Sequence, residues 1–231
     1  MEFSGWEKLS LVDFDDNLTT TLFTAGCNFR CPFCHNGGLV LHPNDNPQIP
    51  WELILDYLKR RKKELDAVCV TGGEPTLMPD LEDKLRDIKS LGYLVKLDTN
   101  GTHPALMKKL YEEGLVDYFA MDIKNAKAKY PLTSGIPNLD LSPIEESVHW
   151  LLTSGARFEF RTTIISEFHT EEDMRQIASW IEGAPRYYLQ RYIDSEQCIE
   201  HGLHMVPKEE AERFLEILKP HVKETGLRSY D

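Results

Sequence analysis

The sequence contains no long apolar run and no leader-like beginning. Residues 1–8 include acids and lack the apolar segment of a secretory signal, and no later apolar stretch is long enough to span a bilayer. Basic residues are also in deficit, with 26 Lys and Arg against 38 Asp and Glu and a formal charge of −12. Because binding to phosphate groups requires clustered Lys and Arg, neither nucleic acid nor an anionic membrane is expected as the main partner. We therefore expect a cytoplasmic protein.

Internal repeats, low-complexity tracts and long linkers are absent as well. A chain of 231 residues is long enough for one domain with a substantial core. We therefore predict a single domain over residues 1–231, made of an N-terminal hairpin over 1–18, a core over 19–192, and a C-terminal helix and tail over 193–231.

Cysteine is scarce, but its distribution is informative. There are five cysteines, an odd number, and Cys27, Cys31 and Cys34 fall within eight residues. This crowding does not suggest a disulfide framework, and reduced thiols are more often ligands or catalysts. Three thiolates on one loop hold three corners of an iron-sulfur cube, which leaves one iron open to a substrate.

A structural zinc site is the main alternative for the cysteine loop. Zinc requires four ligands in a closed tetrahedron, so His35 or the distant Cys69 would have to supply the fourth. Zinc ribbons usually present two Cys-x2-Cys pairs, whereas this chain has one. The spacing therefore favours iron-sulfur chemistry, with His35 outside the ligand set because the open iron must stay accessible.

Strand-like and helix-like segments alternate along the chain. Strands separated by single helices imply parallel pairing with right-handed crossovers. Six such strands are too few for a closed eight-stranded barrel, so we predict an α/β fold with an open, partial (β/α)6 TIM-like barrel. After an opening hairpin, the predicted strands are 19–24, 67–71, 93–98, 117–123, 157–165 and 186–192, and the predicted helices are 51–64, 80–91, 104–113, 142–153, 170–182 and 208–219.

Polar residues gather where these predicted strands end. In folds of this kind the chemistry collects at the C-terminal ends of the strands. We therefore expect thiolates, carboxylates, a lysine and an arginine to lie together at the C-terminal ends of the strands. The candidates, in chain order, are Cys27, Gly72, Gly73, Glu74, Asp98, Asn100, Asp122, Lys124 and Arg161.

These motifs resemble a known family. The cysteine loop is similar to the cluster-binding signature of the radical S-adenosylmethionine (radical SAM) enzymes, and His35-Asn36 resembles the subgroup that activates glycyl radical enzymes. Residues 8–14 precede the first core strand as they do in the anaerobic ribonucleoside-triphosphate reductase activating proteins. The resemblance covers residues 9–192 and departs at Asp15-Asp16, a hairpin turn where such proteins often have Pro-Gly.

The resemblance implies two cofactors and assigns residues to them. Cys27, Cys31 and Cys34 would hold one 4Fe-4S cluster, whose fourth iron binds S-adenosylmethionine (SAM). Glu74 and its neighbouring backbone would hold the methionine ammonium, and Lys124 would contact the carboxylate. The remaining residues implied at the cosubstrate are Phe33 and His35 by the adenine, Gly72 and Gly73 at the backbone, Asn100, Arg161, and Asp98 and Asp122 flanking a monovalent cation.

Several of these residues also have simpler explanations. Gly72 and Gly73 alone are compatible with an ordinary β-turn. Strand-end acids such as Asp98 and Asp122 often cap the following helix. Arg161 in an alternating strand is also explained by a salt bridge with an acid on a neighbouring strand. Further alternatives are Phe33 as a core aromatic, Cys69 as a small buried hydrophobe, and Cys198 as a loop residue without a role.

The resemblance implies an activating enzyme that cleaves SAM reductively and installs a glycyl radical in a partner, most specifically anaerobic ribonucleoside-triphosphate reductase. Flavodoxin or ferredoxin would supply the electron. No residue beyond the ligands of the cluster and cosubstrate is expected to be catalytic, because the cofactor performs the chemistry. The alternatives are activation of a pyruvate formate-lyase type enzyme, a small-molecule radical SAM enzyme similar to deazaguanine synthases, and a non-catalytic iron-sulfur or zinc module.

Overall fold

The computed structural model describes residues 3–230. Its internal contacts divide the chain into two compact units. Unit 1 contains the chain up to Asn28, Gly38–Thr99 and His103–Phe119, and unit 2 contains Phe29–Gly37, Asn100–Thr102 and the chain from Ala120 onward. Each unit is described by itself below, and the single domain expected from the sequence stays a prediction.

Four strands form the sheet of unit 1: β1 (Gly5–Ser10), β2 (Thr19–Thr24), β3 (Ala67–Gly72) and β4 (Leu94–Thr99). β1 pairs antiparallel with β2, a strand that the sequence analysis placed in the core rather than in the hairpin over 1–18, and β2, β3 and β4 then pair in parallel in chain order. Since Thr24 is paired with Gly72, β2 and β3 end at the same edge of the sheet. The segments that follow these two strands therefore start side by side.

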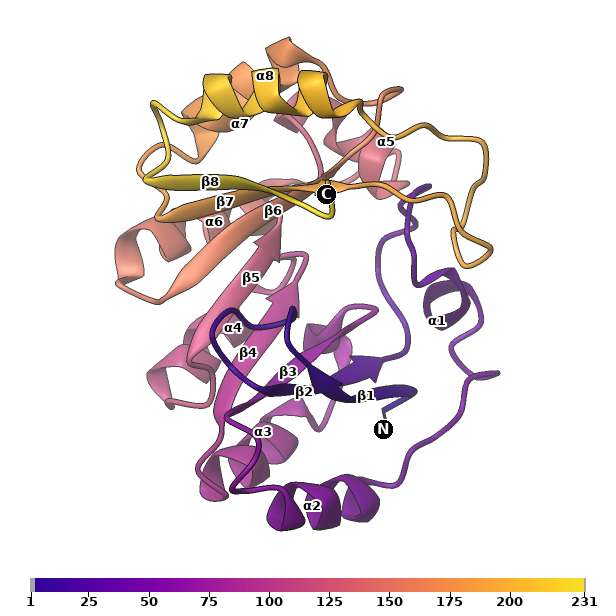
Figure 1. The fold of residues 1–231 in the computed structure, drawn as a ribbon, viewed down its shortest axis with the longest axis vertical. Helices are drawn as coiled ribbons and strands as arrows, with labels where there is room; N and C mark the ends of the chain where they lie inside the picture. Colours follow the sequence, from indigo (N-terminus) through magenta and orange to yellow (C-terminus); the bar gives the residue numbers. More distant parts are fainter. Residues whose placement is uncertain (1–2, 231) are drawn as a thin grey trace. The chain divides into compact units, whose positions relative to one another are not determined.

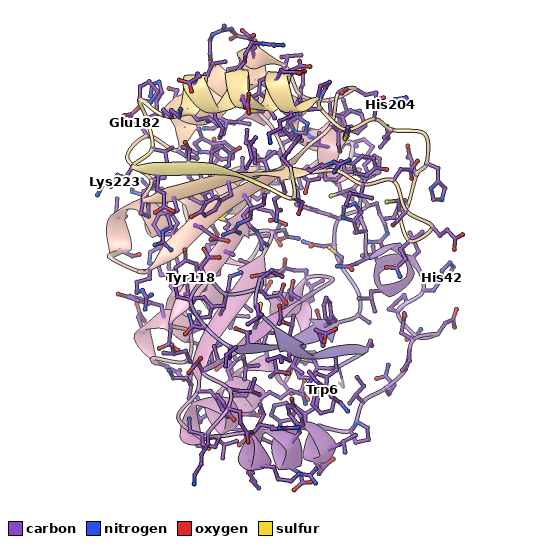
Figure 2. The ribbon with its side chains drawn as sticks, in the orientation of Figure 1. Trp6, His42, Tyr118, Glu182, His204 and Lys223 are labelled. Atoms are coloured by element: carbon purple, nitrogen blue, oxygen red, sulfur yellow. The ribbon has the colours of Figure 1, made fainter. Side chains whose placement is uncertain are left out.

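Helices of unit 1 cover this sheet with amphipathic faces. They are α2 (Trp51–Arg60), α3 (Leu81–Ser90) and α4 (Pro104–Glu112), with α2 and α3 next to each other in Figure 1. Phe14, Ala67 and Tyr118, the last labelled in Figure 2, form a buried cluster. The ring centroids of Phe14 and Tyr118 lie 5.2 Å apart. Three short elements are α1 (Gly37–Leu41), which follows the cysteine loop, η1 (Pro75–Leu77) and β5 (Tyr118–Asp122), whose last residues belong to unit 2.

Unit 2 contains the parallel strands β6 (Phe158–Ile164), β7 (Arg186–Arg191) and β8 (Glu224–Arg228). Helices α7 (Glu171–Trp180) and α8 (Lys208–Leu218) pack together on one face of these strands (Figure 1). α7 begins at a capping box in which Thr170 and Asp173 satisfy each other's backbone N–H groups. The other elements are η2 (Lys127–Lys129), α5 (Tyr130–Ser134) and α6 (Ser142–Ser154).

The α/β class and the parallel pairing predicted from the sequence are confirmed. The segment predicted as a C-terminal helix and tail, however, also contains a strand. Residues assigned to it include β8, which pairs with β7 from Arg186↔Glu224 to Gln190↔Arg228. The five residues of β8 contain one Gly and are exposed or half-buried, so they lack the apolar alternation that marks a strand. The other strand predictions agree with the structure to within a few residues, whereas the helix predicted over 51–64 ends at Arg60.

The helices among residues 3–230 include none that is both long enough and apolar enough to cross a membrane.

Candidate functional site

In unit 1 the cysteine loop starts directly after β2. Gly26 has a positive φ of 85°, a conformation that favours glycine, and its N–H donates to the carbonyl of Leu39 at 2.8 Å. Cys27 follows and is half-buried, with its Sγ 3.9 Å from Oδ1 of Asn28. The chain thus leaves the sheet in a bend that presents Cys27 at the end of β2.

The Gly72-Gly73-Glu74 segment is bound to this bend. The N–H of Gly73 donates to the carbonyl of Thr24, and the N–H of Glu74 donates to the carbonyl of Gly26, both at 2.8 Å. A Cβ at position 73 would lie 1.9 Å from the carbonyl oxygen of Gly26, so only glycine fits there. The two segments implied to serve cluster and cosubstrate are therefore joined by their backbones, one residue before Cys27.

The Glu74 carboxylate is almost completely buried, with 1% of the residue exposed. Its Oε1 accepts hydrogen bonds from the N–H of Thr76 at 3.1 Å, the hydroxyl of Thr76 at 2.5 Å and the hydroxyl of Thr99 at 2.7 Å. Because the Thr76 hydroxyl donates to Glu74, His103 donates its Nδ1–H to Thr76 across 2.9 Å. This network holds Glu74 in place as the N-cap of η1.

Sequence reasoning assigned no role to Thr76, Thr99 or His103. Thr76 lies two residues after Glu74, which is the spacing at which a cap accepts a backbone N–H, so a capping argument would have found it. Thr99 and His103 carry no local signal, because they reach Glu74 and Thr76 only through the tertiary fold.

Asp98 in unit 1 has a cation beside it that the sequence analysis did not single out. Its Oδ1 lies 3.1 Å from Nζ of Lys96, and the side chains are 12% and 4% exposed. Lys96 also donates to the carbonyl of Asp13 at 2.5 Å. Cys69 is fully buried, as predicted, and its Sγ lies 3.8 Å from the same Asp98 oxygen. Lys96 therefore balances the charge of Asp98 within its own unit.

The second half of the cysteine loop belongs to unit 2. The N–H of Cys34 donates to the carbonyl of Cys31 at 3.0 Å, so the two cysteines stand at the ends of one turn. Phe33 between them is 5% exposed, and its ring centroid is 6.2 Å from that of Phe168. Burial raises the pKa of the Cys34 thiol, while the positive charge of Lys124 acts in the opposite direction.

His35 is held by the segment that follows β7. Its ring stacks on Tyr192 with centroids 5.6 Å apart and an interplanar angle of 8°, and its Nε2 lies 2.9 Å from the carbonyl oxygen of Ile193. Gly37 donates to the carbonyl of Gln197, and Glu200 donates to the carbonyl of Pro32. The 192–200 segment thus braces the cysteine loop, a role that the sequence analysis did not predict.

Cys198 lies within this brace and is 6% exposed. Its Sγ lies 3.6 Å from the carbonyl oxygen of Ile193 and 3.7 Å from the hydroxyl of Ser195. The same long connection between β7 and α8 is held further along by His204, labelled in Figure 2, whose Nδ1 is 2.6 Å from the Glu167 carboxylate.

Asp122, Lys124 and Arg161 form an ion cluster in unit 2. Lys124 donates from Nζ to one carboxylate oxygen of Asp122 at 2.9 Å, and Arg161 lies 3.1 Å from the other through both Nε and Nη2. The alternative expectation of a salt bridge for Arg161 is therefore confirmed. Burial acts to raise the pKa of Asp122, but the two cations outweigh it and lower the pKa to about 2. Burial likewise opposes the charge of Lys124, but Asp122 raises the pKa of Lys124 above its ordinary value.

Tyr130 and Asn100 are two further polar residues of unit 2. The hydroxyl of Tyr130, whose pKa is raised by burial, donates to the backbone carbonyl of Asp122 at 3.2 Å. Asn100 is 5% exposed, and its Oδ1 accepts from both the N–H and the hydroxyl of Thr102. Tyr130 thus supports the ion cluster from the backbone side, and Asn100 closes a local turn after β4.

The donor chemistry of the cysteine loop fits an iron-sulfur cluster. All five cysteines are thiols, and Cys27, Cys31 and Cys34 lie on one loop between β2 and α1. Cys27 belongs to unit 1, and the other two belong to unit 2. Among residues 3–230 the structure gathers no group of three His, Cys, Asp or Glu side chains in the arrangement of a metal site. The three-cysteine ligand set therefore stays a prediction.

Comparison with known proteins relates the chain to one superfamily. The model described as the radical SAM superfamily matches residues 21–181. MJ1227 of Methanocaldococcus jannaschii, which is named as a glycyl-radical enzyme activating enzyme, is 30% identical over 98% of this chain and 95% of its own length.

Solved structures show the same fold. Streptococcus suis SuiB bound to S-adenosylmethionine is 14% identical with a TM-score of 0.71, over 89% of this chain and 49% of SuiB, so the chain spans about half of SuiB. A domain of pyruvate-formate lyase-activating enzyme from Bacteroides vulgatus is 15% identical with a TM-score of 0.59, over 71% of this chain and 99% of that domain. Identities this low concern the fold alone, and the partial barrel predicted from the sequence is confirmed.

Proposed function

We propose that this chain, which belongs to the radical SAM superfamily, installs a glycyl radical in a partner enzyme, with anaerobic ribonucleoside-triphosphate reductase as that partner. Membership implies a 4Fe-4S cluster and SAM, which makes the chain a radical SAM enzyme of the oxidoreductase type. The near full-length relation to a protein named as a glycyl-radical enzyme activating enzyme supports activation over the other chemistries of the superfamily.

One structural observation carries the catalytic part of the proposal. The Gly72-Gly73-Glu74 segment donates backbone hydrogen bonds to Thr24 and Gly26, next to Cys27. A metal carrier or a zinc-stabilised module has no use for a cosubstrate segment packed against its first ligand. A radical SAM enzyme needs that arrangement, because its cosubstrate binds the iron that the three cysteines leave open.

In the proposed enzyme Cys27, Cys31 and Cys34 hold the cluster. A reduced cluster held there would supply the electron for reductive cleavage of SAM, the chemistry by which a Cα hydrogen would be taken from a partner glycine. Flavodoxin or ferredoxin is the proposed electron donor. The partner's target is a glycine because the absence of a side chain lets its loop enter a crowded site.

The other residues bind and orient the cosubstrate. Gly72, Gly73 and Glu74 bind the ammonium group through backbone and carboxylate oxygens. Lys124 binds the carboxylate, and the Asp122 carboxylate keeps it charged. Phe33 and His35 border the adenine, their rings held by Phe168 and Tyr192. We further propose that Asn100 and Arg161 border the cosubstrate and that Asp98 and Asp122 flank a monovalent cation.

Electron paramagnetic resonance tests this function. The enzyme, reconstituted anaerobically and reduced, is mixed with SAM and with anaerobic ribonucleotide reductase or pyruvate formate-lyase type partners. We expect the doublet of a glycyl radical with the reductase, together with formation of 5′-deoxyadenosine. Consumption of a small molecule without a doublet on any partner would show that the activase assignment is wrong, and one equivalent of zinc without SAM cleavage would exclude radical chemistry.

A further inference from the structure

His169 is a buried histidine in unit 2 that the proposed chemistry leaves unused. It is 2% exposed and lies at the end of the turn Ile165–His169, which connects β6 to α7. The turn closes on itself, because the N–H groups of Phe168 and His169 both donate to the carbonyl of Ile165, at 3.1 and 2.9 Å. His169 therefore occupies a fixed position immediately before the capping box that starts α7.

The His169 ring connects this turn to Lys124. Its Nε2 lies 3.0 Å from the backbone carbonyl oxygen of Lys124, which can only accept, so Nε2 carries the proton. Its Nδ1 lies 3.1 Å from the N–H of Ile165 and accepts from it, and the carbonyl oxygen of Ile165 is 3.3 Å away. A neutral ring protonated at Nε2 satisfies both contacts.

A second hydrogen bond runs parallel to this one. The fully buried Asn125 donates from its side-chain amide to the carbonyl of Phe168 at 3.0 Å. The backbone of Lys124 and the side chain of Asn125 are thus both hydrogen-bonded to the turn Ile165–His169, at the adjacent residues His169 and Phe168. The turn in turn contacts the cysteine loop through the rings of Phe168 and Phe33.

Burial, rather than nearby charge, favours the neutral ring of His169. Burial lowers the pKa of His169 and outweighs the hydrogen bonds to the backbones of Lys124 and Ile165, which raise it; Asp173 on α7 also raises it, and Lys129 at the end of η2 lowers it. Those two side chains pair with each other at 2.6 Å, which leaves little net charge facing the ring. His169 therefore donates its Nε2–H to the Lys124 carbonyl as a neutral ring.

We propose that His169 is a positioning residue: its hydrogen bond to the Lys124 carbonyl fixes the backbone from which the Lys124 ammonium reaches the carboxylate of SAM. The inference rests on the proposed role of Lys124. The Asp122 carboxylate binds the Lys124 ammonium, and His169 binds the Lys124 backbone carbonyl. Both the side chain and the main chain of the lysine are therefore held in place. A lysine that is already ordered loses less conformational entropy when SAM binds, which increases the affinity for SAM.

Two substitutions separate this role from stabilisation of the turn. The amide of Gln reaches about as far as Nε2, so His169→Gln keeps the donor to Lys124, whereas the shorter amide of His169→Asn reaches only the Nδ1 position and serves Ile165. We expect His169→Asn to raise the SAM dissociation constant and the KM for SAM roughly tenfold, with a smaller change in kcat. His169→Gln should remain near wild type, and both variants should retain wild-type iron content.

Two more measurements make the test decisive. In a Lys124→Met background, His169→Asn should cause no further loss of SAM affinity, because it acts through the residue already removed. Long-range ¹H–¹⁵N spectra of the wild-type imidazole should report the neutral Nε2–H form. Equal SAM affinity in the Asn and Gln variants, an additive loss in the double variant, or an Nδ1–H form would each overturn the inference. SAM binding and cleavage without a glycyl radical on any partner would instead refute the proposed function and leave the role of His169 intact.

Discussion

Asp122 is the residue on which two cations of unit 2 depend. Its carboxylate accepts from Lys124 on one oxygen and from Arg161 on the other, and the Arg161 side chain is only 12% exposed. A cation this poorly solvated is costly without its counter-ion. The carboxylate therefore stabilises the fold and sets the charge state of the lysine assigned to the cosubstrate.

The first prediction concerns the pH dependence of stability. The pKa of Asp122 is lowered from 3.8 to about 2, so its contribution is complete above pH 4 and disappears as the pH falls through 2. We expect wild type to exceed Asp122→Asn in free energy of unfolding by a margin that shrinks by about 2 kcal/mol over this interval. Urea titrations at several pH values measure the margin, and a constant margin would contradict the assignment.

The second prediction concerns the close contact at Gly73. Because a Cβ there would lie 1.9 Å from the Gly26 carbonyl oxygen, Gly73→Ala must displace one of the two segments, at a cost of about 3 kcal/mol. SAM binding should weaken along with stability. Gly38→Ala is the matched control, since its Cβ would meet nothing within 4 Å. Urea unfolding and equilibrium dialysis of SAM compare the two variants, and equal behaviour would refute the packing argument.

At the scale of elements, β8 pairs with β7 in the sheet of unit 2 and is also tied to β6 by a buried ion pair. Arg228 donates to both carboxylate oxygens of Glu159 on β6, at 2.7 and 2.9 Å, and its guanidinium lies 3.9 Å from the Tyr188 ring centroid. The Glu159 side chain is 2% exposed. A short, half-exposed strand is thus secured by a two-pronged contact that spans three strands.

The third prediction follows from this contact. Arg228→Ala removes the partner of a buried carboxylate, and we expect a loss of about 3 kcal/mol in the free energy of unfolding. Hydrogen exchange should accelerate in β8 ahead of β7. Arg213→Ala serves as control, because Arg213 is 59% exposed and lies 3.6 Å from Glu171, so its loss should be below about 1 kcal/mol. A similar loss in both variants would show that the pair does not anchor β8.

At the scale of the whole molecule, the cysteines have different proposed roles. The proposed ligands are Cys27, Cys31 and Cys34, whereas Cys198 is a buried thiol in the segment that braces the cysteine loop. The proposed function requires Cys27, Cys31 and Cys34 together. The ligand set proposed for the cluster does not include Cys198.

The fourth prediction separates these roles. Cys31→Ala should abolish both the binding of about four irons per chain and reductive SAM cleavage, because a cube with two protein ligands is not retained. Cys198→Ala should keep both. Iron analysis, optical spectra and chromatography of 5′-deoxyadenosine provide the readouts. SAM cleavage that persists in Cys31→Ala would mean that the cluster ligands are misassigned.

Local pattern was sufficient for much of this molecule. The parallel strands up to β7 and the longer helices between them follow from apolar periodicity and from punctuation by Gly and Pro, whereas the five-residue helices α1 and α5 were not predicted. Residues at strand ends, among them Gly73, Asp98 and Asp122, were identified because chain order alone brings parallel strand ends to one edge. β8 was missed because an edge strand of five half-exposed residues leaves no such pattern.

The sequence by itself determined the α/β class, the order of the elements and the thiol donor set, since each depends on residues close together in the chain. Only the tertiary structure decided which groups form ion pairs and hydrogen bonds with one another. Arg161 on Asp122 across 39 positions, Thr99 on Glu74 and His169 on Lys124 all join separate elements, whereas Lys96 stands two positions before Asp98 on the same face of β4. Hydrogen bonds and ion pairs act over a few ångströms in space, whereas periodicity records only which face of an element is buried.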